Sequence, residues 1–235
     1  MASTVNGYRF TGQKYVFDKT YNITKAPADC DWSRWGMLHG DAQEYGGEAY
    51  RLYCFVRGTS SRLYQFVLNR STNSFEFGYS PNPNKETTIK VIKITGTPNT
   101  GLSNTLGMCN NDTQFKLYKF GASVNTNGRM YEYIYDGTSY DYKRRLNVEI
   151  TSDIDYGKMG MLYNQENRYG KEGTRLYCPM VSDSDKIVQF KLNDAGDLFT
   201  RVDDMPIERV PNQDNLRSFS LAFGQGTFNL YYLGQ

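Results

Sequence analysis

The chain has 235 residues, and its 27 basic and 25 acidic side chains leave a formal net charge of +2. A protein that binds nucleic acid through its phosphates carries a marked excess of basic residues, so we expect no nucleic-acid partner. Hydrophobic residues make up 39% of the chain, without an apolar run of membrane-spanning length. The composition therefore predicts one domain over residues 1–235 and no membrane span.

The first residues and the cysteines bear on location. Residues 1–6 lack the basic segment and the apolar core of a secretory signal peptide. Cys54 and Cys178 fall in the middle of apolar strand patterns, where a cysteine behaves as a small hydrophobic residue. We therefore expect a cytoplasmic protein with four reduced thiols.

From there the chain presents short segments in which apolar and polar residues alternate, separated by turn-forming residues. The first alternating segment is 14–17. A small apolar segment at 36–38 follows, and then Tyr- and Phe-rich segments at 51–55, 63–66 and 75–79. Period-two alternation interrupted by Gly, Asn, Ser and Thr predicts β-strands joined by hairpins.

The same succession of segments returns three more times. Its most regular element is a Leu-Tyr pair, which begins at Leu52, Leu117, Leu176 and Leu230. Intervals of about 54–65 residues between copies are typical of repeat arrays and propellers. A residue that recurs in every copy belongs to the scaffold, so we expect the functional residues where the copies differ.

The fourth copy is incomplete, because the chain ends at Gln235, soon after Leu230. We expect its missing strand at the other end of the chain, in residues 14–17. A unit shared between the two termini closes a ring and leaves no open sheet edge. A β-trefoil would need three units, and a linear solenoid would need caps in place of complementary ends.

The sequence therefore predicts an all-β fold, specifically a four-bladed β-propeller with about four antiparallel strands per blade. The ring would close where the N-terminal strand pairs with the C-terminal blade. The expected blades cover about 29–82, 88–143, 147–203, and 207–235 plus 7–20.

A family resemblance supports this layout. In the first unit, Gly36-Met37-Leu38 is followed by Tyr53-Cys54-Phe55, Tyr64-Gln65-Phe66 and Gly78-Tyr79. This succession, repeated along most of the chain, resembles the hemopexin-type four-bladed propellers. The resemblance implies a ring with an ion site on its axis, which that family builds from backbone oxygens of the inner strands. The family usually joins its first and last blades by a cysteine bridge, whereas this chain has its cysteines at internal positions: Cys30, Cys54, Cys109 and Cys178.

The first and third units share an Asp-x-Asp motif ahead of their Gly-Met pair. Its residues are Asp29 and Asp31 in the first unit, and Asp153 and Asp155 in the third. Like units face each other across a ring of four, so the four carboxylates would line one mouth of the central channel. Carboxylate oxygens bind Ca²⁺ and Mg²⁺, and such an ion is the cofactor that the sequence suggests. Alternatively, the aspartates cap turns that lead into the inner strands.

His39 is the single histidine, which excludes a His-rich metal site. The residues expected at its place in the other units are Asn110, Tyr163 and Gly224. All four are predicted near the axis, at the mouth opposite the aspartates. There His39 is either an exposed residue of the rim or a ligand contact or general base.

Two tryptophans, Trp32 and Trp35, occur in the first unit alone, beside an acidic segment at 41–48. Aromatic side chains next to polar ones are typical of a pocket for a sugar or another small molecule. The alternative is that the tryptophans pack between the first and second blades. The candidate ligand-binding residues are therefore Trp32, Trp35, His39, Asn110 and Tyr163.

These patterns favour a non-catalytic binding module with one asymmetric site on the face of the ring or in its channel. Its partner is a small molecule, a glycan or a protein, and the sequence leaves this choice and the oligomeric state open. A lectin with a sugar site in each blade or blade pair is one alternative. An enzyme that uses His39, Tyr163, Asp31 or Asp155 as acid or base is the second.

Overall fold

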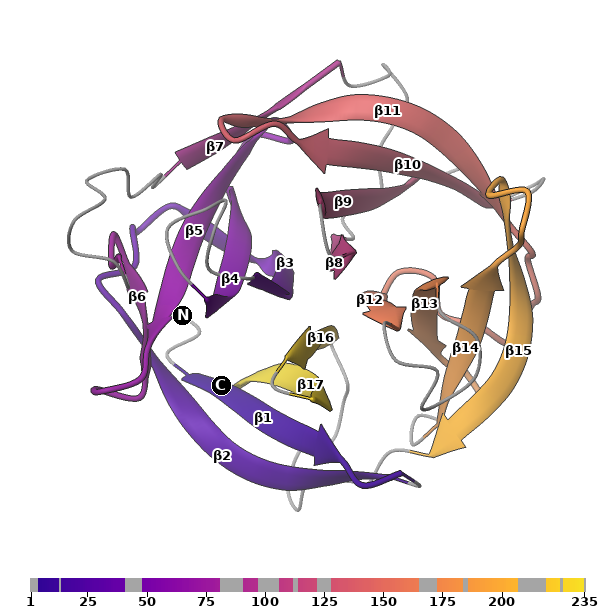
Figure 1. The fold of residues 1–235 in the computed structure, drawn as a ribbon, viewed down its shortest axis with the longest axis horizontal. Coiled ribbons are helices and arrows are strands. Elements are labelled where there is room, and N and C mark those ends of the chain that lie inside the picture. Colours follow the sequence, from indigo (N-terminus) through magenta and orange to yellow (C-terminus); the bar gives the residue numbers. More distant parts are fainter. Residues whose placement is uncertain are drawn as a thin grey trace.

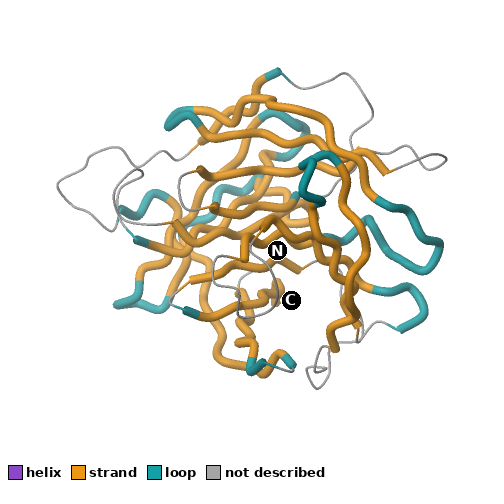
Figure 2. The backbone as a smooth tube through the Cα atoms, turned by 45° about the vertical axis from the view of Figure 1, so that its right-hand side comes forward, coloured by secondary structure: helices purple, strands orange, loops and turns teal. Residues whose placement is uncertain are grey.

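The computed structural model describes residues 4–12, 14–40, 48–80, 91–96, 106–111, 114–121, 128–164, 173–183, 186–206, 219–224 and 226–234. These residues form 17 strands and no helix, which confirms the expected all-β class. The described part of the chain accordingly has no helix that could cross a membrane. All 17 strands belong to one sheet, which curves into a nearly closed barrel shape (Figure 1). The turns lie at its periphery (Figure 2).

The strands fall into four units, each an antiparallel succession from the axis outward. The first unit contains β3 (Cys30–Gly40), β4 (Ala49–Val56), β5 (Arg62–Asn69), β6 (Ser74–Phe77) and β7 (Val91–Thr95). The second contains β8 (Gly107–Asn111), β9 (Gln114–Gly121), β10 (Gly128–Tyr135) and β11 (Ser139–Val148). The third contains β12 (Gly160–Asn164), β13 (Gly173–Pro179), β14 (Lys186–Leu192) and β15 (Leu198–Pro206). The fourth contains β16 (Phe219–Gly224), β17 (Thr227–Gly234), β1 (Thr4–Phe10) and β2 (Tyr15–Thr24).

The Leu-Tyr repeat of the sequence has the same register in every unit. The tyrosine lies opposite one inner-strand position: Tyr53 opposite Gly36, Tyr118 opposite Gly107, Tyr177 opposite Gly160 and Tyr231 opposite Ser220. The fourth inner strand therefore has a serine where the others have a glycine. In this strand, Phe223 is the residue equivalent to His39. The predicted equivalence of Gly224 with His39 is therefore wrong by one residue.

Parallel pairings join the outer strands of neighbouring units, so the units are not separate sheets. β2 pairs with β6, β7 pairs with β11, and β11 pairs with β15. The outer strands are long enough to reach two partners. β11 pairs with β7 near its beginning and with β15 through its last residues, Asn147 and Val148. These pairings join the outer strands from the fourth unit through the first and second to the third, whereas a propeller with separate blades would lack them.

The two ends of the chain meet in the fourth unit, where β1 lies between β17 and β2 (Figure 1). Thr4 pairs with Gly234 on one side and with Asn22 on the other. The segment expected to close the unit, 14–17, belongs mostly to β2, one strand further out. The N-terminal part of this unit thus covers 4–24, while the unit bounds expected near 82, 88 and 207 lie outside the described residues.

The sequence does not mark β1 as the strand that pairs with β17, because β1 has a glycine at the repeat position. Gly7 lies opposite Tyr231, at the place where the third strands of the other units carry Gln or Glu. A Cβ atom on Gly7 would lie 3.1 Å from the Tyr21 ring and 3.3 Å from the Tyr231 ring. The close approach of these rings therefore favours glycine, and β1 lacks the repeat pattern that marks the other third strands.

The inner strands β3, β8, β12 and β16 contact one another in cyclic order around the axis (Figure 1). Glycines permit this approach, since a Cβ atom on Gly107 would lie only 2.2 Å from Met161 Cγ. In the fourth unit, Ser220 Oγ accepts a hydrogen bond from the Met37 backbone N–H at 2.8 Å. Four apolar side chains are fully buried at this level of the axis: Met37, Met108, Met161 and Leu221. The middle of the axis is therefore part of the core.

Candidate functional site

The inner strands of the four units end at one mouth of the axis with four different side chains. The equivalent residues are His39, Asn110, Tyr163 and Phe223, each opposite the first part of the following strand. These four residues, with Glu48 and Arg70, are called the rim here. At the rim, the strand positions are equivalent in the four units but the side chains differ.

His39 is not an exposed rim residue, because only 7% of its surface is accessible. Its ring packs against the Tyr50 ring, with the centroids 4.6 Å apart. Its Nε2 lies 3.3 Å from Oε1 of Glu48, and Arg70 Nη2 lies 3.7 Å from the same oxygen. Glu48 and Arg70 are both half exposed, so they connect the buried imidazole to the solvent. The rest of the expected acidic segment, 41–47, lies outside the described residues.

Tyr50 links this histidine to the fourth unit. Asn229 Nδ2 donates a hydrogen bond of 3.0 Å to the Tyr50 hydroxyl, which also bonds the Tyr231 hydroxyl. Burial raises the pKa of Tyr50 to about 12, so the phenol stays protonated at neutral pH. A Cβ atom on Gly224 would lie 2.6 Å from the His39 ring, which explains the glycine there. His39 is therefore held from two units at once.

On the second strand of each unit, the residue that directly precedes the Leu-Tyr pair is polar, and these residues form a layer. Arg51, Lys116, Arg175 and Asn229 occupy the same register position, opposite the inner-strand residue that precedes the rim. Arg51 Nη1 donates to the Ala49 carbonyl at 3.1 Å, and its guanidinium lies 5.6 Å from the centroid of the Phe115 ring. Three cations therefore stand behind the rim. Sequence reasoning missed this layer, although Arg, Lys and Arg precede three of the Leu-Tyr pairs.

A second buried layer repeats in three units and also escaped notice in the sequence. The Leu-Tyr hydroxyl bonds the side chain opposite it on the third strand: Tyr53 to Gln65 at 3.0 Å, Tyr118 to Glu132 at 2.8 Å, and Tyr177 to Gln189 at 2.8 Å. Arg175 Nη1 also donates to Gln189 Oε1 at 2.6 Å. A buried polar layer whose members bond one another makes the scaffold behind the rim rigid.

The two aspartates of the first unit bond groups of their own unit. Asp29 accepts hydrogen bonds from the Tyr64 hydroxyl at 2.9 and 3.0 Å. Asp31 accepts bonds from Arg34 Nε at 2.8 Å and from Ser33. Burial raises the pKa of Asp31, but the hydrogen bonds from Ser33 and Arg34 outweigh it and leave the pKa below its usual value.

The aspartates of the third unit do the same. Asp153 accepts from Arg201 Nη1 at 3.2 Å, while Asp155 lies 3.1 Å from Lys158 Nζ and accepts from the Gly157 N–H. The structure does not bring the two pairs together. Within the described ranges, no group of three or more His, Cys, Asp and Glu side chains is placed to hold a metal ion. Asp31 and Asp155 make local contacts of the kind expected for turn residues, whereas Asp29 and Asp153 bond side chains on distant strands.

The tryptophans lie at the far end of β3 from His39. Trp35 is buried in a core that the first and fourth units share, not between the first and second units, and the half-buried Trp32 packs on the Phe66 ring at 5.4 Å. The structure therefore brings His39, Asn110 and Tyr163 to one rim but leaves Trp32 and Trp35 in packing positions.

Lys119 is a further unusual residue that sequence reasoning missed. It is 1% exposed and lies between the first and second units, where its Nζ donates to the Ser60 carbonyl. Its ammonium lies 5.0 Å from the Phe55 ring and 5.3 Å from the Tyr133 ring. Burial, with Arg34 nearby, lowers the pKa of Lys119 to about 8. The signal was its departure from the other copies, which have Cys54, Cys178 and Tyr232 at this position.

Comparison with known proteins assigns no family. No protein-family model matches the sequence, and no curated protein is significantly similar to it.

Proposed function

We propose that this chain is a four-bladed β-propeller of hemopexin-like layout that acts as a non-catalytic binding module. Its single asymmetric ligand site is the rim at the His39 end of the axis. The proposal rests on one observation: at this end of the axis the strands are equivalent, but their side chains differ. Four equivalent strand ends carry an imidazole, an amide, a phenol and a phenyl ring above a scaffold that repeats.

The propeller assignment is supported by three features of the sheet. Each unit is an antiparallel succession of strands, the four inner strands contact one another in cyclic order, and a strand from the N-terminus completes the last unit. Parallel pairings of the described strands also join the outer strands at three of the four junctions between units. Closure of that kind leaves few open edges and gives a rigid frame for a binding site.

The chemistry of the rim favours a polar ligand with an apolar face, such as a sugar or another hydroxylated small molecule. Tyr163 and Phe223 are half-buried aromatic side chains, while Asn110, Glu48 and Arg70 supply donors and acceptors. Sites for small ligands combine aromatic surfaces with a few placed polar groups in this way. A lectin with one site per unit gains less support, because the four strand ends differ.

An enzyme gains less support as well. Asp31 and Asp155 are paired with cations of their own turns, Arg34 and Lys158, and belong to the other ends of their units' inner segments. Of the expected acid–base residues, His39 and Tyr163 share the rim, while Asp31 and Asp155 lie away from it.

The proposal is tested by a glycan array together with a thermal-shift screen of hydroxylated metabolites. Any ligand found is then tested against Tyr163→Ala and against Tyr142→Ala, a matched change at an exposed tyrosine of β11. We expect binding to be lost in Tyr163→Ala and kept in Tyr142→Ala. A ligand that binds both variants equally, or a screen without any ligand, would overturn the assignment.

A further inference from the structure

The first unit contains a pair of cysteines whose side chains meet. Cys30 begins β3 and Cys54 lies in β4, with 2% and 0% of their surfaces exposed. Both are free thiols, and the two thiols bond each other. The other two cysteines, Cys109 and Cys178, are also free and buried, but they lie in the second and third units.

The pairing of β3 with β4 explains how the two thiols come together. Cys30 lies opposite Val56, whereas Trp35 lies opposite Cys54, because the register shifts between Asp31 and Trp35. Cys54 and Val56 point to the same face of β4, since side chains alternate along a strand. Cys30 and Cys54 are therefore diagonal neighbours on one face, beside an irregularity where the ladder is interrupted.

A covalent bond requires the two side chains to approach further. A disulfide requires the sulfurs to move from contact distance to about 2.0 Å, with the Cα atoms typically within about 7 Å. Cys30 is well placed to make this movement, because it follows a turn in which its N–H bonds the Pro27 carbonyl at 3.2 Å. Ala28 and Asp29 in that turn are exposed, so the turn that precedes Cys30 faces the solvent.

The electrostatic surroundings separate this pair from the other thiols. The hydrogen bond from Cys54 lowers the pKa of Cys30, with help from Arg57, although burial opposes it. Burial raises the pKa of Cys109 to about 12 and that of Cys178 well above its usual value. Since the thiolate is the reactive form of cysteine, Cys30 is the member of the pair that we expect to react first.

We propose that Cys30 and Cys54 are a modification site that closes to a reversible disulfide when the folded protein meets hydrogen peroxide. The Cys30 thiolate attacks one peroxide oxygen, the O–O bond breaks, and the protonated leaving oxygen departs as water. Cys30 is then a sulfenic acid. The Cys54 sulfur attacks the Cys30 sulfur, the S–O bond breaks, and a second water leaves. Two thiols lose two electrons and two protons, and one peroxide becomes two waters.

The bond would join the turn that enters β3 to the second strand of the same unit. This turn is also where the chain passes from β2 of the fourth unit into the first. The disulfide would therefore fasten the junction between the closing unit and the unit that follows it. Reduction by a dithiol reverses the step, since disulfides exchange with thiolates.

The test treats the native, reduced protein with a small excess of hydrogen peroxide. Remaining thiols are then alkylated in denaturant, and the digested peptides are analysed by mass spectrometry. We expect a linked peptide pair containing Cys30 and Cys54, lighter by two hydrogen atoms, while Cys109 and Cys178 are recovered alkylated. Dithiothreitol before alkylation should return Cys30 and Cys54 to the alkylated form.

Two variants test which cysteines form the link. Cys178→Ser changes the thiol at the equivalent strand position of the third unit and should leave the Cys30–Cys54 link intact. Cys54→Ser should stop the reaction at a Cys30 sulfenic acid, which dimedone traps. Recovery of all four cysteines in the alkylated form after peroxide would overturn the proposal, as would links that join Cys30 to Cys109 or Cys178. The wild-type measurement decides this even if a variant fails to fold.

Discussion

At the scale of single residues, Lys119 places a charge inside an apolar interface. Its Nζ has the Ser60 carbonyl and two aromatic rings around it, yet its pKa is lowered to about 8. The free-energy cost of removing the ammonium from water is therefore larger than the stabilisation that these contacts provide. Because the unfolded chain has a lysine pKa near 10.4, the unfolded state binds more protons than the native state between about pH 8 and 10.4. The destabilisation that charged Lys119 causes is therefore absent above about pH 10.4 and fully present below about pH 8.

We predict that the free energy of unfolding of wild type, compared with Lys119→Met, increases with pH across this window. The change should reach at most about 3 kcal/mol, because each pKa unit corresponds to about 1.4 kcal/mol. Urea unfolding at several values between pH 7 and 10.5 measures it. Lys143→Met, at an exposed lysine of β11, is the control and should show no such dependence. Parallel curves for wild type and Lys119→Met would contradict the prediction.

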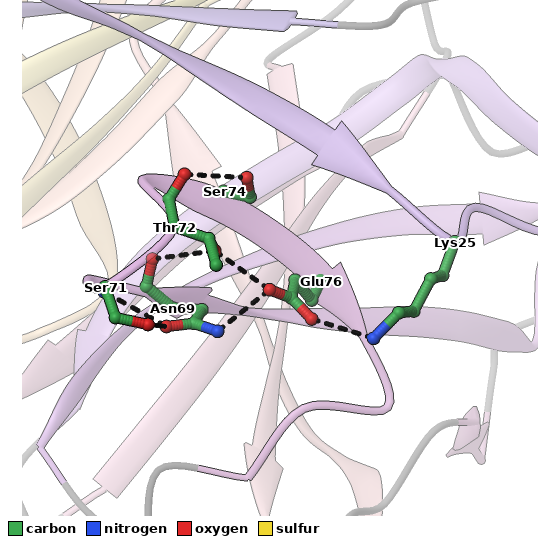
Figure 3. A network of polar contacts seen from close by, with 6 residues as sticks. All are labelled: Lys25, Asn69, Ser71, Thr72, Ser74 and Glu76. Carbon is green, nitrogen blue, oxygen red and sulfur yellow. Dashed lines mark hydrogen bonds and ion pairs between the residues drawn. The ribbon is translucent and has the colours of Figure 1, made fainter.

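At the scale of elements, a polar network joins β2 to β6, where the fourth unit meets the first (Figure 3). Glu76, on β6, accepts hydrogen bonds of 2.9 Å from Lys25, Asn69 and Thr72. Its side chain is buried, so these donors replace the water that the carboxylate loses. The bond from Lys25 is the main reason that the pKa of Glu76 lies below its usual value.

We predict that Glu76→Gln lowers the free energy of unfolding at pH 7 by about 1.5–3 kcal/mol, the range for hydrogen bonds to a charged group. Since the folded pKa of Glu76 is depressed, its contribution is present above the unfolded pKa, near 4.3, and disappears as the pH falls through the folded value. The difference between wild type and Glu76→Gln should therefore shrink on acidification. Asp194→Asn, at an exposed turn of the third unit, is the control for urea unfolding at pH 7 and at pH 3. An equal decrease in the free energy of unfolding at both pH values would show that the charge of Glu76 does not cause the stabilisation.

At the scale of the whole molecule, closure depends on β1, which pairs with β17 on one side and with β2 on the other. Val5, Tyr8 and Phe10 are buried in the core of this region. Deletion of residues 1–10 would remove these side chains and open a sheet edge on each neighbour. Deletion of 228–235 would remove the strand on which β1 lies.

We predict that either deletion abolishes the cooperative unfolding transition, because every unit depends on its neighbours for burial. Calorimetry of the purified chains measures this. Phe17→Ser, at a β2 side chain that is 55% exposed, is the control and should unfold in a sharp transition close to that of wild type. A deleted chain that also unfolds sharply near the wild-type temperature would refute closure by β1.

The local pattern of the sequence was enough to predict the all-β class, the fourfold Leu-Tyr repeat and the burial of Cys54 and Cys178. It was enough because alternation and composition report whether a side chain of that same segment is buried. The tertiary structure alone decided that β1 and not 14–17 pairs with β17, and that parallel pairings between outer strands join the units into one barrel-shaped sheet. It also decided that His39 meets Glu48 and that Cys30 meets Cys54. Partners such as these depend on strand register between distant segments, and a register shift like the one in β3 leaves no mark in the alternation of either strand.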